Sequence, residues 1–458
     1  MKPFVSIIIT FLVILLTLNK LFAQEDAGIS NLKWYLSDDK SSRAGIMLVN
    51  QFWARYIQNN PDNKGTAQYP DYDLSFRRSR VLLYASIEDK VLVYTQVGHD
   101  GQTYKQGKYQ GLTLFNVQAE YIMLKDKFHL GFGLHGWNGI SRYSNSMFTE
   151  FLVADYPGIA YPMEGTFDLS GSQLGIYARG NLDKLNYQFS LVKPFETGTH
   201  AISSPVTTER MNENFAVKGY LSWQFFDKEN NILPYMTMNN LGRGKLLNIG
   251  AGFYYHPEAM LVEAQKDIST VDAMLAGLLI MAGNYELLNE LADYFPSDIS
   301  DIFIAAVDVF LDLPAKGNSA FTSYLGYYYN FYGPNYLRSM SKMNVSNMVA
   351  GFVLPQGQGN SEWEVGTGHL LRGEIGYLLP GNKLKSRFQP YGAVTWKNFD
   401  ALGETSLQFD GGINWLLNSH NIKWTLQYSS RPVYSIVEKQ YLIDQYKGQV
   451  ILQTQIYF

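Results

Sequence analysis

Apolar and polar residues alternate with a period of two through most of this chain from Ser42 onward. In the last segment Val450 and Leu452 fall on one face, whereas Gln453 and Gln455 fall on the other. Such alternation predicts β-strands whose two faces meet different surroundings. Two architectures fit: a soluble sandwich, with its apolar faces on a core, or a membrane barrel, with its apolar face toward lipid and its polar face toward a lumen.

Strand length and aromatic placement favour the barrel. The alternating segments run for about 10 to 14 residues, against about five to six in soluble sheets. Tryptophans gather near the segment ends, as interfacial girdles require. They are Trp53, Trp137, Trp223, Trp396, Trp415 and Trp424. The chain ends in Tyr457-Phe458, which looks like the terminal aromatic signal of bacterial outer-membrane barrels.

The connections between segments alternate between tight charged turns and long loops, which is the pattern of periplasmic turns and outer loops. The tight turns are 88–90, 125–127, 181–184 and 418–421, and the long loops are 58–71, 100–111, 137–170 and 194–212. The sequence therefore predicts an all-β fold, a transmembrane antiparallel β-barrel.

A first pass gives seventeen extended segments, but single-chain bacterial barrels have an even number of strands. With both termini periplasmic, the strand from Ser319 runs outward and the strand through 371–379 runs inward. Segment 344–357 between them then cannot cross the membrane. About sixteen strands remain, and residues 24–458 form one barrel.

Residues 257–301 interrupt the strand pattern. Apolar residues recur there at a spacing of three to four, in 271–275 and 285–291, which predicts one or two helices in an outer loop. The segment holds nine acidic residues and one lysine. It is predicted as an acidic, partly helical extracellular insertion, for which docking a partner, covering the mouth and plain solvation all remain open.

Residues 1–23 read as a secretory signal peptide. Lys2 gives a positive start, 5–18 an apolar stretch, and Leu21-Phe22-Ala23 a cleavage site. A transmembrane anchor is the alternative, but Lys20 interrupts the segment. Export of a strand-rich chain predicts the outer membrane of a Gram-negative bacterium, with its lipid as the surrounding partner.

Composition excludes several functions. The absence of cysteine excludes a disulfide scaffold, a thiolate metal site and a cysteine nucleophile. A net charge of −4 argues against nucleic-acid binding. No helical histidine pair, Gly-x-Ser-x-Gly or phosphate loop is present, so we expect no metal, no cofactor and no enzyme. A serine with His129 or His135 is the one catalytic alternative, and both histidines fall on the predicted lumen face.

Charged residues in the strands are informative because an Arg or Lys facing lipid at mid-membrane costs about 2–4 kcal/mol. The phase of each strand places a mixed set of charges inside. The predicted pore-lining residues are Arg78, Arg80, Glu120, Arg179, Lys218, Asp308, Arg372, Glu374, Asp410 and Lys423, with Asp312 and Lys397 on the same face. The same phase turns Arg77 outward near the outer rim. These charges either select ions or solvate the wall and pair across strands.

Loop 137–170 is predicted to fold into the lumen and form the constriction, with an exposed surface loop as the alternative. Its polar candidates are Arg142, Tyr143, Glu150, Asp155, Tyr156 and Glu164.

Several short motifs resemble the phosphate-selective porin O and P family of Gram-negative outer membranes. They are Phe76-Arg77-Arg78-Ser79-Arg80, Gly333-Pro334-Asn335-Tyr336, Gly366-Thr367-Gly368, Leu379-Pro380-Gly381 and Phe388-Gln389-Pro390-Tyr391. The resemblance implies a sixteen-stranded diffusion channel that forms a homotrimer. Phosphate selectivity in that family relies on a ladder of lumen arginines, whereas here the inward arginines are few and stand among anions.

Two functions follow. The first is a porin that lets small hydrophilic solutes or ions diffuse through a water-filled barrel. The second is a plugged barrel that serves as an anchor or subunit of a surface or secretion assembly, with 257–301 as its docking element.

Overall fold

The computed structural model describes residues 32–58, 71–103, 111–136, 139–163, 171–195, 207–209, 212–229, 235–263, 297–339, 348–349, 352–353, 363–382, 386–437 and 440–458. The predicted signal peptide and the predicted helices at 271–275 and 285–291 lie outside these residues. None of the helices in the described part is long and apolar enough to span a bilayer.

Eighteen strands join in one sheet. In chain order they are β1 (Leu32–Tyr35), β2 (Arg43–Ile57), β3 (Asp71–Ile87), β4 (Val91–Thr103), β5 (Thr113–Leu124), β6 (Phe128–His135), β7 (Gln173–Leu182), β8 (Leu185–Lys193), β9 (Thr207–Glu209), β10 (Ala216–Gln224), β11 (Leu246–Glu263), β12 (Ser297–Pro314), β13 (Ala320–Phe331), β18 (Gly368–Leu378), β19 (Arg387–Phe399), β20 (Ser406–Asn418), β21 (Ile422–Val437) and β22 (Gln440–Tyr457).

Short elements complete the described chain. Three 3-10 turns are η1 (Tyr143–Asn145), η2 (Phe148–Glu150) and η3 (Lys316–Asn318). Four short strands pair outside the main sheet: β14 (Leu337–Ser339) with β17 (Trp363–Gly366), and β15 (Met348–Val349) with β16 (Phe352–Val353).

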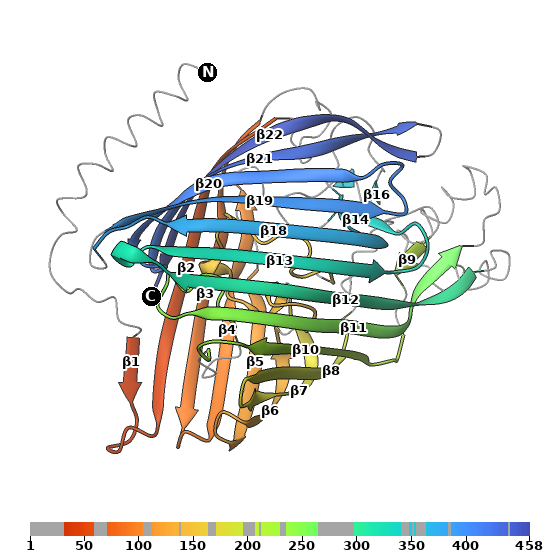
Figure 1. The fold of residues 1–458 in the computed structure, drawn as a ribbon. Helices are drawn as coiled ribbons and strands as arrows, with labels where there is room; N and C mark the ends of the chain where they lie inside the picture. Colours follow the sequence, from red (N-terminus) through yellow and green to blue (C-terminus); the bar gives the residue numbers. More distant parts are fainter. Residues whose placement is uncertain are drawn as a thin grey trace.

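Sixteen of the eighteen strands form a closed antiparallel barrel (Figure 1). The ring closes where β2 pairs with β22, from Val49 opposite Tyr457 to Ile57 opposite Gln449. Strands β1 and β9 lie outside this ring and extend the ends of β2 and β11. Closure satisfies the backbone groups that an open sheet would leave at its edges, which lipid cannot bond. The predicted barrel of about sixteen strands is confirmed, as is the exclusion of 344–357, where β15 and β16 pair only with each other.

Alternating burial shows which face of each strand points inward. In β13 and β19 buried residues alternate with more exposed ones almost without interruption. The exposed positions are large and apolar, such as Leu325, Tyr327 and Val394, whereas Thr322 and Gln389 are buried. This is the reverse of a soluble protein, because the outer surface is apolar and the interior is rich in polar groups.

The predicted limits of the acidic insertion were too wide. Strand β11 continues to Glu263 and β12 begins at Ser297, so both ends of the predicted 257–301 segment are strand. Pairing between β11 and β12 is irregular between His256 and Met260, where Glu258 has a φ of 55°. That irregularity interrupts the alternation of apolar and polar residues. The start of the insertion was placed at residue 257 because the alternation stops there.

Candidate functional site

The ten residues predicted to line the pore occupy the inner face of the ring. Nine of them are at most 7% exposed, and the side chain of Arg80 is 10% exposed. The buried nine are Arg78, Glu120, Arg179, Lys218, Asp308, Arg372, Glu374, Asp410 and Lys423. Strand phase therefore places each side chain correctly, while their role in lining a conducting path stays a prediction.

Arg77 lies inside the barrel, so the outward orientation predicted from strand phase was wrong. The side chain is 1% exposed and lies beside Arg78. Between β2 and β3, Gln51 pairs with Arg78 and the next position, Phe52, pairs with Phe76. Arg77 is the extra residue of a β-bulge, which turns two consecutive side chains to the same face.

One group of inward charges centres on β3. Arg80 forms an ion pair with Asp100 of β4, and Arg77 and Arg78 lie within 3.9 Å and 3.8 Å of the same carboxylate. Asp155 is the second anion: its carboxylate accepts hydrogen bonds from Arg77 Nε at 2.8 Å and from Arg78 Nη2 at 2.7 Å. Three guanidiniums thus face two carboxylates, which leaves one excess positive charge.

A second group lies on β5 to β7. Glu120 accepts hydrogen bonds from Arg179 Nε and Nη2, both at 2.7 Å, and its Oε1 is 2.7 Å from His129 Nδ1. Tyr177 donates to the same carboxylate at 3.0 Å. His129 is therefore part of a wall network, which is the ordinary structural role of a buried histidine.

A third group lies on β18 and β20. Arg372 donates to Glu374 at 2.6 Å and is 3.5 Å from Asp410. Tyr143, which is not on the wall, also donates to Glu374 at 2.6 Å. This contact joins the wall to the segment that follows β6.

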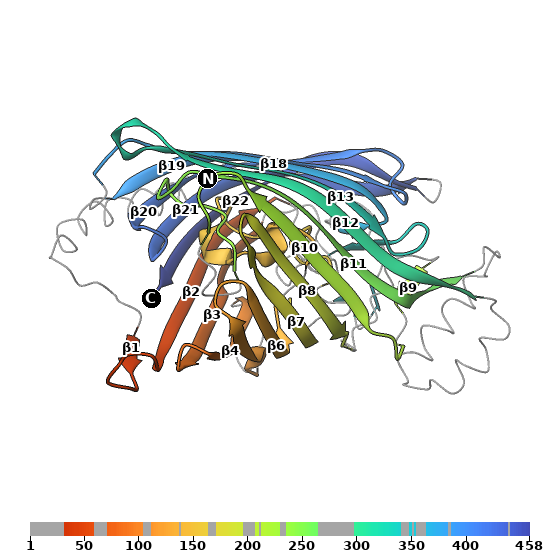
Figure 2. The same ribbon diagram turned by 60° about the horizontal axis from the view of Figure 1, so that its bottom comes forward.

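Residues 139–163, here called the inward loop, run inside the ring from the end that carries the long loops (Figure 2). All four residues predicted for the constriction contact the inner wall or other interior groups. Besides the Tyr143 and Asp155 contacts, Arg142 pairs with Glu229 at 2.6 Å, and the Tyr156 ring lies 5.0 Å from the Arg78 guanidinium. Glu164 lies outside the described residues. The loop is thus an interior segment, and its role as the narrowest point of a path stays a prediction.

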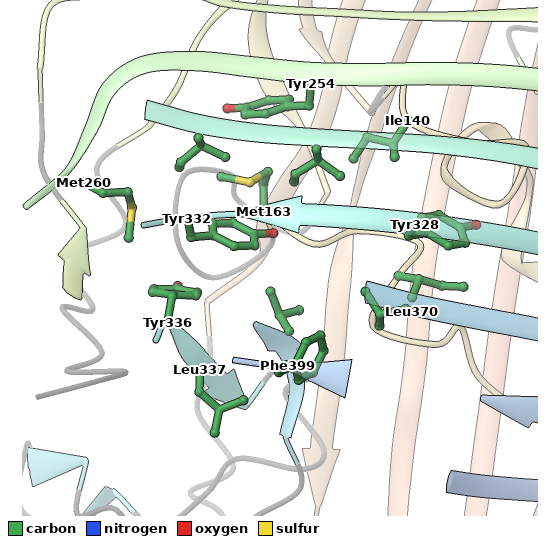
Figure 3. Packing of buried hydrophobic residues seen from close by; sticks show 14 of the residues in the cluster. Ile140, Met163, Tyr254, Met260, Tyr328, Tyr332, Tyr336, Leu337, Leu370 and Phe399 are labelled. Carbon is green, nitrogen blue, oxygen red and sulfur yellow. The ribbon is translucent and has the colours of Figure 1, made fainter. Parts of the chain in front are cut away.

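Apolar packing fixes one side of the inward loop. Ile140 and Met163 of the loop belong to a buried cluster with Tyr254 of β11, Tyr328 of β13 and Leu370 of β18 (Figure 3). Burial of side chains of this size contributes about 1.5–3 kcal/mol each. The loop is therefore anchored against β11 to β18 on this side.

The opposite side of the loop is held by polar wall residues. Asn414 donates to Leu152 O at 2.9 Å, and Lys423 donates to Phe151 O at 2.9 Å and to Thr149 O at 3.2 Å. Gln427 accepts from the Ala154 backbone at 2.8 Å. On this side the hydrogen bonds to the loop backbone add to apolar contacts, because Phe151, Leu152 and Val153 also share a buried cluster with Tyr391 and Ala393 of β19.

A cavity of about 70 Å³ lies between the loop and this polar wall. Its lining comes from residues 153–159, from β18 to β22 and from Trp53 of β2. The charged members of the lining are Asp155, Arg372, Lys397 and Asp410, two anions and two cations. Space for a few water molecules therefore remains between the loop and this wall, where polar side chains line the cavity together with Trp53, Ile159 and Ile451.

The loop carboxylates differ in their protonation. Burial by itself raises the pKa of Asp155, but the positive charges of Arg77 and Arg78 outweigh it and hold that pKa below its usual value. Burial raises the pKa of Glu150, against the hydrogen bonds from Thr237 and Met238 and the charge of Arg243. Asp155 is thus ionised in its ion pairs, whereas Glu150 binds a proton more readily than an ordinary glutamate.

A second interior segment escaped the sequence analysis. The connection between β10 and β11 lies at the end with the tight turns, but residues 225–245 are far longer than the about two to five residues of a hairpin loop. Its residues 235–242, here called the crossing segment, lie inside the ring, with Met236, Met238 and Asn239 at most 6% exposed. The length of the connection was the available signal.

Metal binding has no support among the described residues, which hold no group of three or more His, Asp or Glu arranged to ligate an ion.

The chain matches no protein-family model and no curated protein sequence. Solved structures of outer-membrane proteins are similar in fold. OprB of Pseudomonas putida is 12% identical, with a TM-score of 0.50 over 92% of this chain and 95% of OprB. The outer-membrane channel DcaP of Acinetobacter baumannii is 12% identical, with a TM-score of 0.49 over 91% and 97% of the two chains. OmpF of Salmonella typhi, in a complex with daunomycin, is 10% identical, with a TM-score of 0.48 over 90% and 98%. The OprB similarity shows a shared barrel fold.

Proposed function

We propose that this protein is a porin that lets small hydrophilic solutes or ions diffuse passively across an outer membrane. The observation that carries the proposal is the closed ring of sixteen strands with an apolar outer face and a charged, polar inner face. A wall of this kind fits a barrel that spans lipid around an interior suited to water and ions. The proposal assigns no catalysis and no cofactor to the chain.

The path runs beside the polar side of the inward loop. Apolar contacts hold the loop on both sides, while the cavity and the hydrogen bonds from wall side chains to the loop backbone lie toward β19 to β22. Movement of residues 149–156 away from this wall would widen the cavity toward the end that carries the long loops. The nearly complete burial of the inward charges describes the closed arrangement.

Location and assembly complete the proposal. The expected signal peptide and the lipid-type outer surface support the outer membrane of a Gram-negative bacterium, with the resemblance to porins supporting a homotrimer. Membership of the phosphate-selective O and P family is a finer proposal with weaker support. Arg78, Arg80 and Arg372 each have a carboxylate partner, so the arginines do not form an uncompensated ladder for phosphate.

A second candidate is a plugged barrel that anchors a surface assembly. The specific observation in its favour is the filled interior: Arg142, Arg179 and Tyr143 are fully buried. A plugged barrel and a closed channel share this feature, so they differ only in whether the interior segments can move.

Swelling of liposomes that contain the refolded protein separates the two candidates. A porin should admit small sugars and amino acids at rates that fall steeply with solute size. Liposomes without protein give the background rate, and circular dichroism shows that the barrel is folded. Swelling no faster than background with folded protein would favour the plugged anchor.

A further inference from the structure

The crossing segment spans the barrel between walls that are far apart in the ring. At one end the Tyr235 hydroxyl lies 3.2 Å from the Tyr94 hydroxyl of β4. At the other, Asn239 donates to Gln389 of β19 at 2.9 Å, and its carbonyl is 2.8 Å from His420 Nε2. Strands β4 and β19 are separated by nine strands along one side of the ring and five along the other. The crossing segment therefore passes over the bore and does not follow one wall.

The last part of the segment is fastened to the turn-side end of β12. Asp312 accepts hydrogen bonds from the backbone of Asn240 at 2.9 Å and of Gly242 at 3.0 Å. Thr322 of β13 donates to the same carboxylate at 2.9 Å. Asp312 was predicted to face the lumen, and its partners show what it holds there: the backbone of an interior segment.

Contacts with the inward loop occupy the middle of the crossing segment. The backbone of Met236 donates to Asn145 O at 2.8 Å, in an isolated β-bridge between Ser146 and Met236. Arg142 Nε donates to Thr237 O at 2.9 Å, and Arg142 Nη2 donates at 2.6 Å to Glu229, which precedes the crossing segment and accepts from the Thr237 backbone at 3.1 Å. Two segments that enter from opposite ends of the barrel therefore meet inside it.

These contacts differ in kind from the wall. Neighbouring wall strands share continuous ladders, whereas the crossing segment and the loop share an isolated bridge, side-chain hydrogen bonds and the buried cluster of Met238 with Tyr143 and Phe151. An element held in this way opens at a lower free energy than the strands around it.

We propose that the crossing segment is a plug that closes the turn-side end of the bore, and that its contacts with Arg142 and Ser146 keep the inward loop in its closed position. Solutes that enter from the long-loop end meet this segment before they can leave. The inference rests on the proposed channel function only in so far as the plug controls the passage of solutes. The position of this segment across the bore does not depend on that function, and two variants test it.

The first variant removes the plug. Residues 229–243 are replaced by Asn-Gly, which closes a tight hairpin next to the existing pairing of Asp227 with Lys245. We expect single-channel conductance in a planar bilayer to rise severalfold. Circular dichroism of the refolded variant checks that the barrel is intact. Conductance equal to that of the wild type would overturn the proposal.

The second variant locks the plug in place. The chain has no cysteine, so Ser146→Cys with Met236→Cys introduces one possible disulfide across the bridge. We expect oxidation to lower conductance to a small fraction of the wild-type value and a reducing agent to restore it. Each single substitution is the matched control. Equal conductance of the oxidised and reduced double variant would contradict a moving plug, even if the hairpin variant fails to fold.

The two proposals fail in different ways. If wild type and reduced double variant are silent while the hairpin variant conducts, the plug is real but the native barrel is no diffusion channel. If the wild type conducts and neither variant changes that conductance, the channel stands and the plug inference fails. Silence of the wild type and of a folded hairpin variant would also reject the plug, because its removal would not have opened the bore.

Discussion

Asp155 accepts a 2.7 Å hydrogen bond from Arg78, a residue 77 positions earlier in the chain. The contact joins the inward loop to the bulge of β3 and uses an arginine side chain that is 1% exposed. A carboxylate of the loop thus compensates charge on the wall. This contact holds the Asp155 end of the inward loop against β3. It also neutralises part of the positive charge inside the barrel.

Replacing Asp155 with Asn should free the loop tip. The substitution leaves Arg77 and Arg78 without this charge partner, and loss of one member of a buried ion pair costs about 3–5 kcal/mol. We expect larger conductance and a reversal potential shifted toward anions in a salt gradient. Asp183→Asn, which removes an exposed pair with Lys228, is the matched control and should change neither. Unaltered conductance and ion selectivity in Asp155→Asn would show that this contact neither holds the loop closed nor affects the ions that pass.

Reversing the wall charge should have the opposite effect on selectivity. Arg78→Glu with Arg80→Glu exchanges two cations of the β3 group for anions beside Asp100 and Asp155. Because charge along a path selects ions of the opposite sign, the reversal potential should shift toward cations. A potential identical to that of the wild type would show that ions do not pass this group.

Closure of the loop should depend on pH through Glu150. Its pKa is raised above 4.5 by burial, so the docked loop binds the proton more tightly than the free loop does. Docking is therefore most stable at low pH and weakens as the pH rises through the raised pKa. The charged groups that act on this site are Arg243, Glu229 and Lys423.

The Glu150 effect is measured as open probability from about pH 5 to about pH 8. We expect the wild type to open more at the upper end and Glu150→Gln, which stays neutral, to lose this dependence. Asp155 cannot produce the same trend, because its lowered pKa keeps it ionised in both the docked and the free loop throughout this pH range. A Glu150→Gln variant with an unchanged pH profile would contradict the assignment.

Two glycines test the packing of the wall. A Cβ at Gly250 would lie 2.0 Å from the hydroxyl of Tyr220, which is buried and donates to Asp308 at 2.7 Å. Nothing lies within 4 Å of a Cβ at Gly411 on the outer face. Gly250→Ala should lower the unfolding free energy by about 1–3 kcal/mol, and Gly411→Ala should change it by less than about 0.5 kcal/mol. Urea unfolding of barrels in lipid vesicles measures both; equal midpoints would refute the packing argument.

The barrel was predictable from sequence because one period governs nearly all of it. A residue on a paired strand faces either lipid or the interior, so the cost of a charge in lipid assigns Glu120 and Arg372 to the inner face. Strand direction likewise excluded 344–357 from the ring. The same reasoning misplaced Arg77, because the phase was carried back from Val81 through the bulge; the adjacent Arg77 and Arg78 mark the point at which the alternation changes phase.

The interior segments were less predictable. The place of 137–170 as the third long loop, which folds into the lumen in sixteen-stranded porins, suggested the inward loop. Nothing in the sequence of this loop named Glu374, Arg77 or Asn414 as partners, since these contacts join positions distant in sequence. The crossing segment was missed because its period matches neither strand nor helix. The limits of 257–301 were misjudged where β11 becomes irregular near Glu258.

Single-channel recording of the refolded wild-type protein in a planar bilayer shows whether this barrel conducts. A porin with this interior should give discrete, repeated steps between a closed and an open level, with a reversal potential in a salt gradient that reports the small cationic excess of the β3 group. A folded barrel that inserts and never conducts would contradict the channel and leave the plugged anchor as the function that fits this structure.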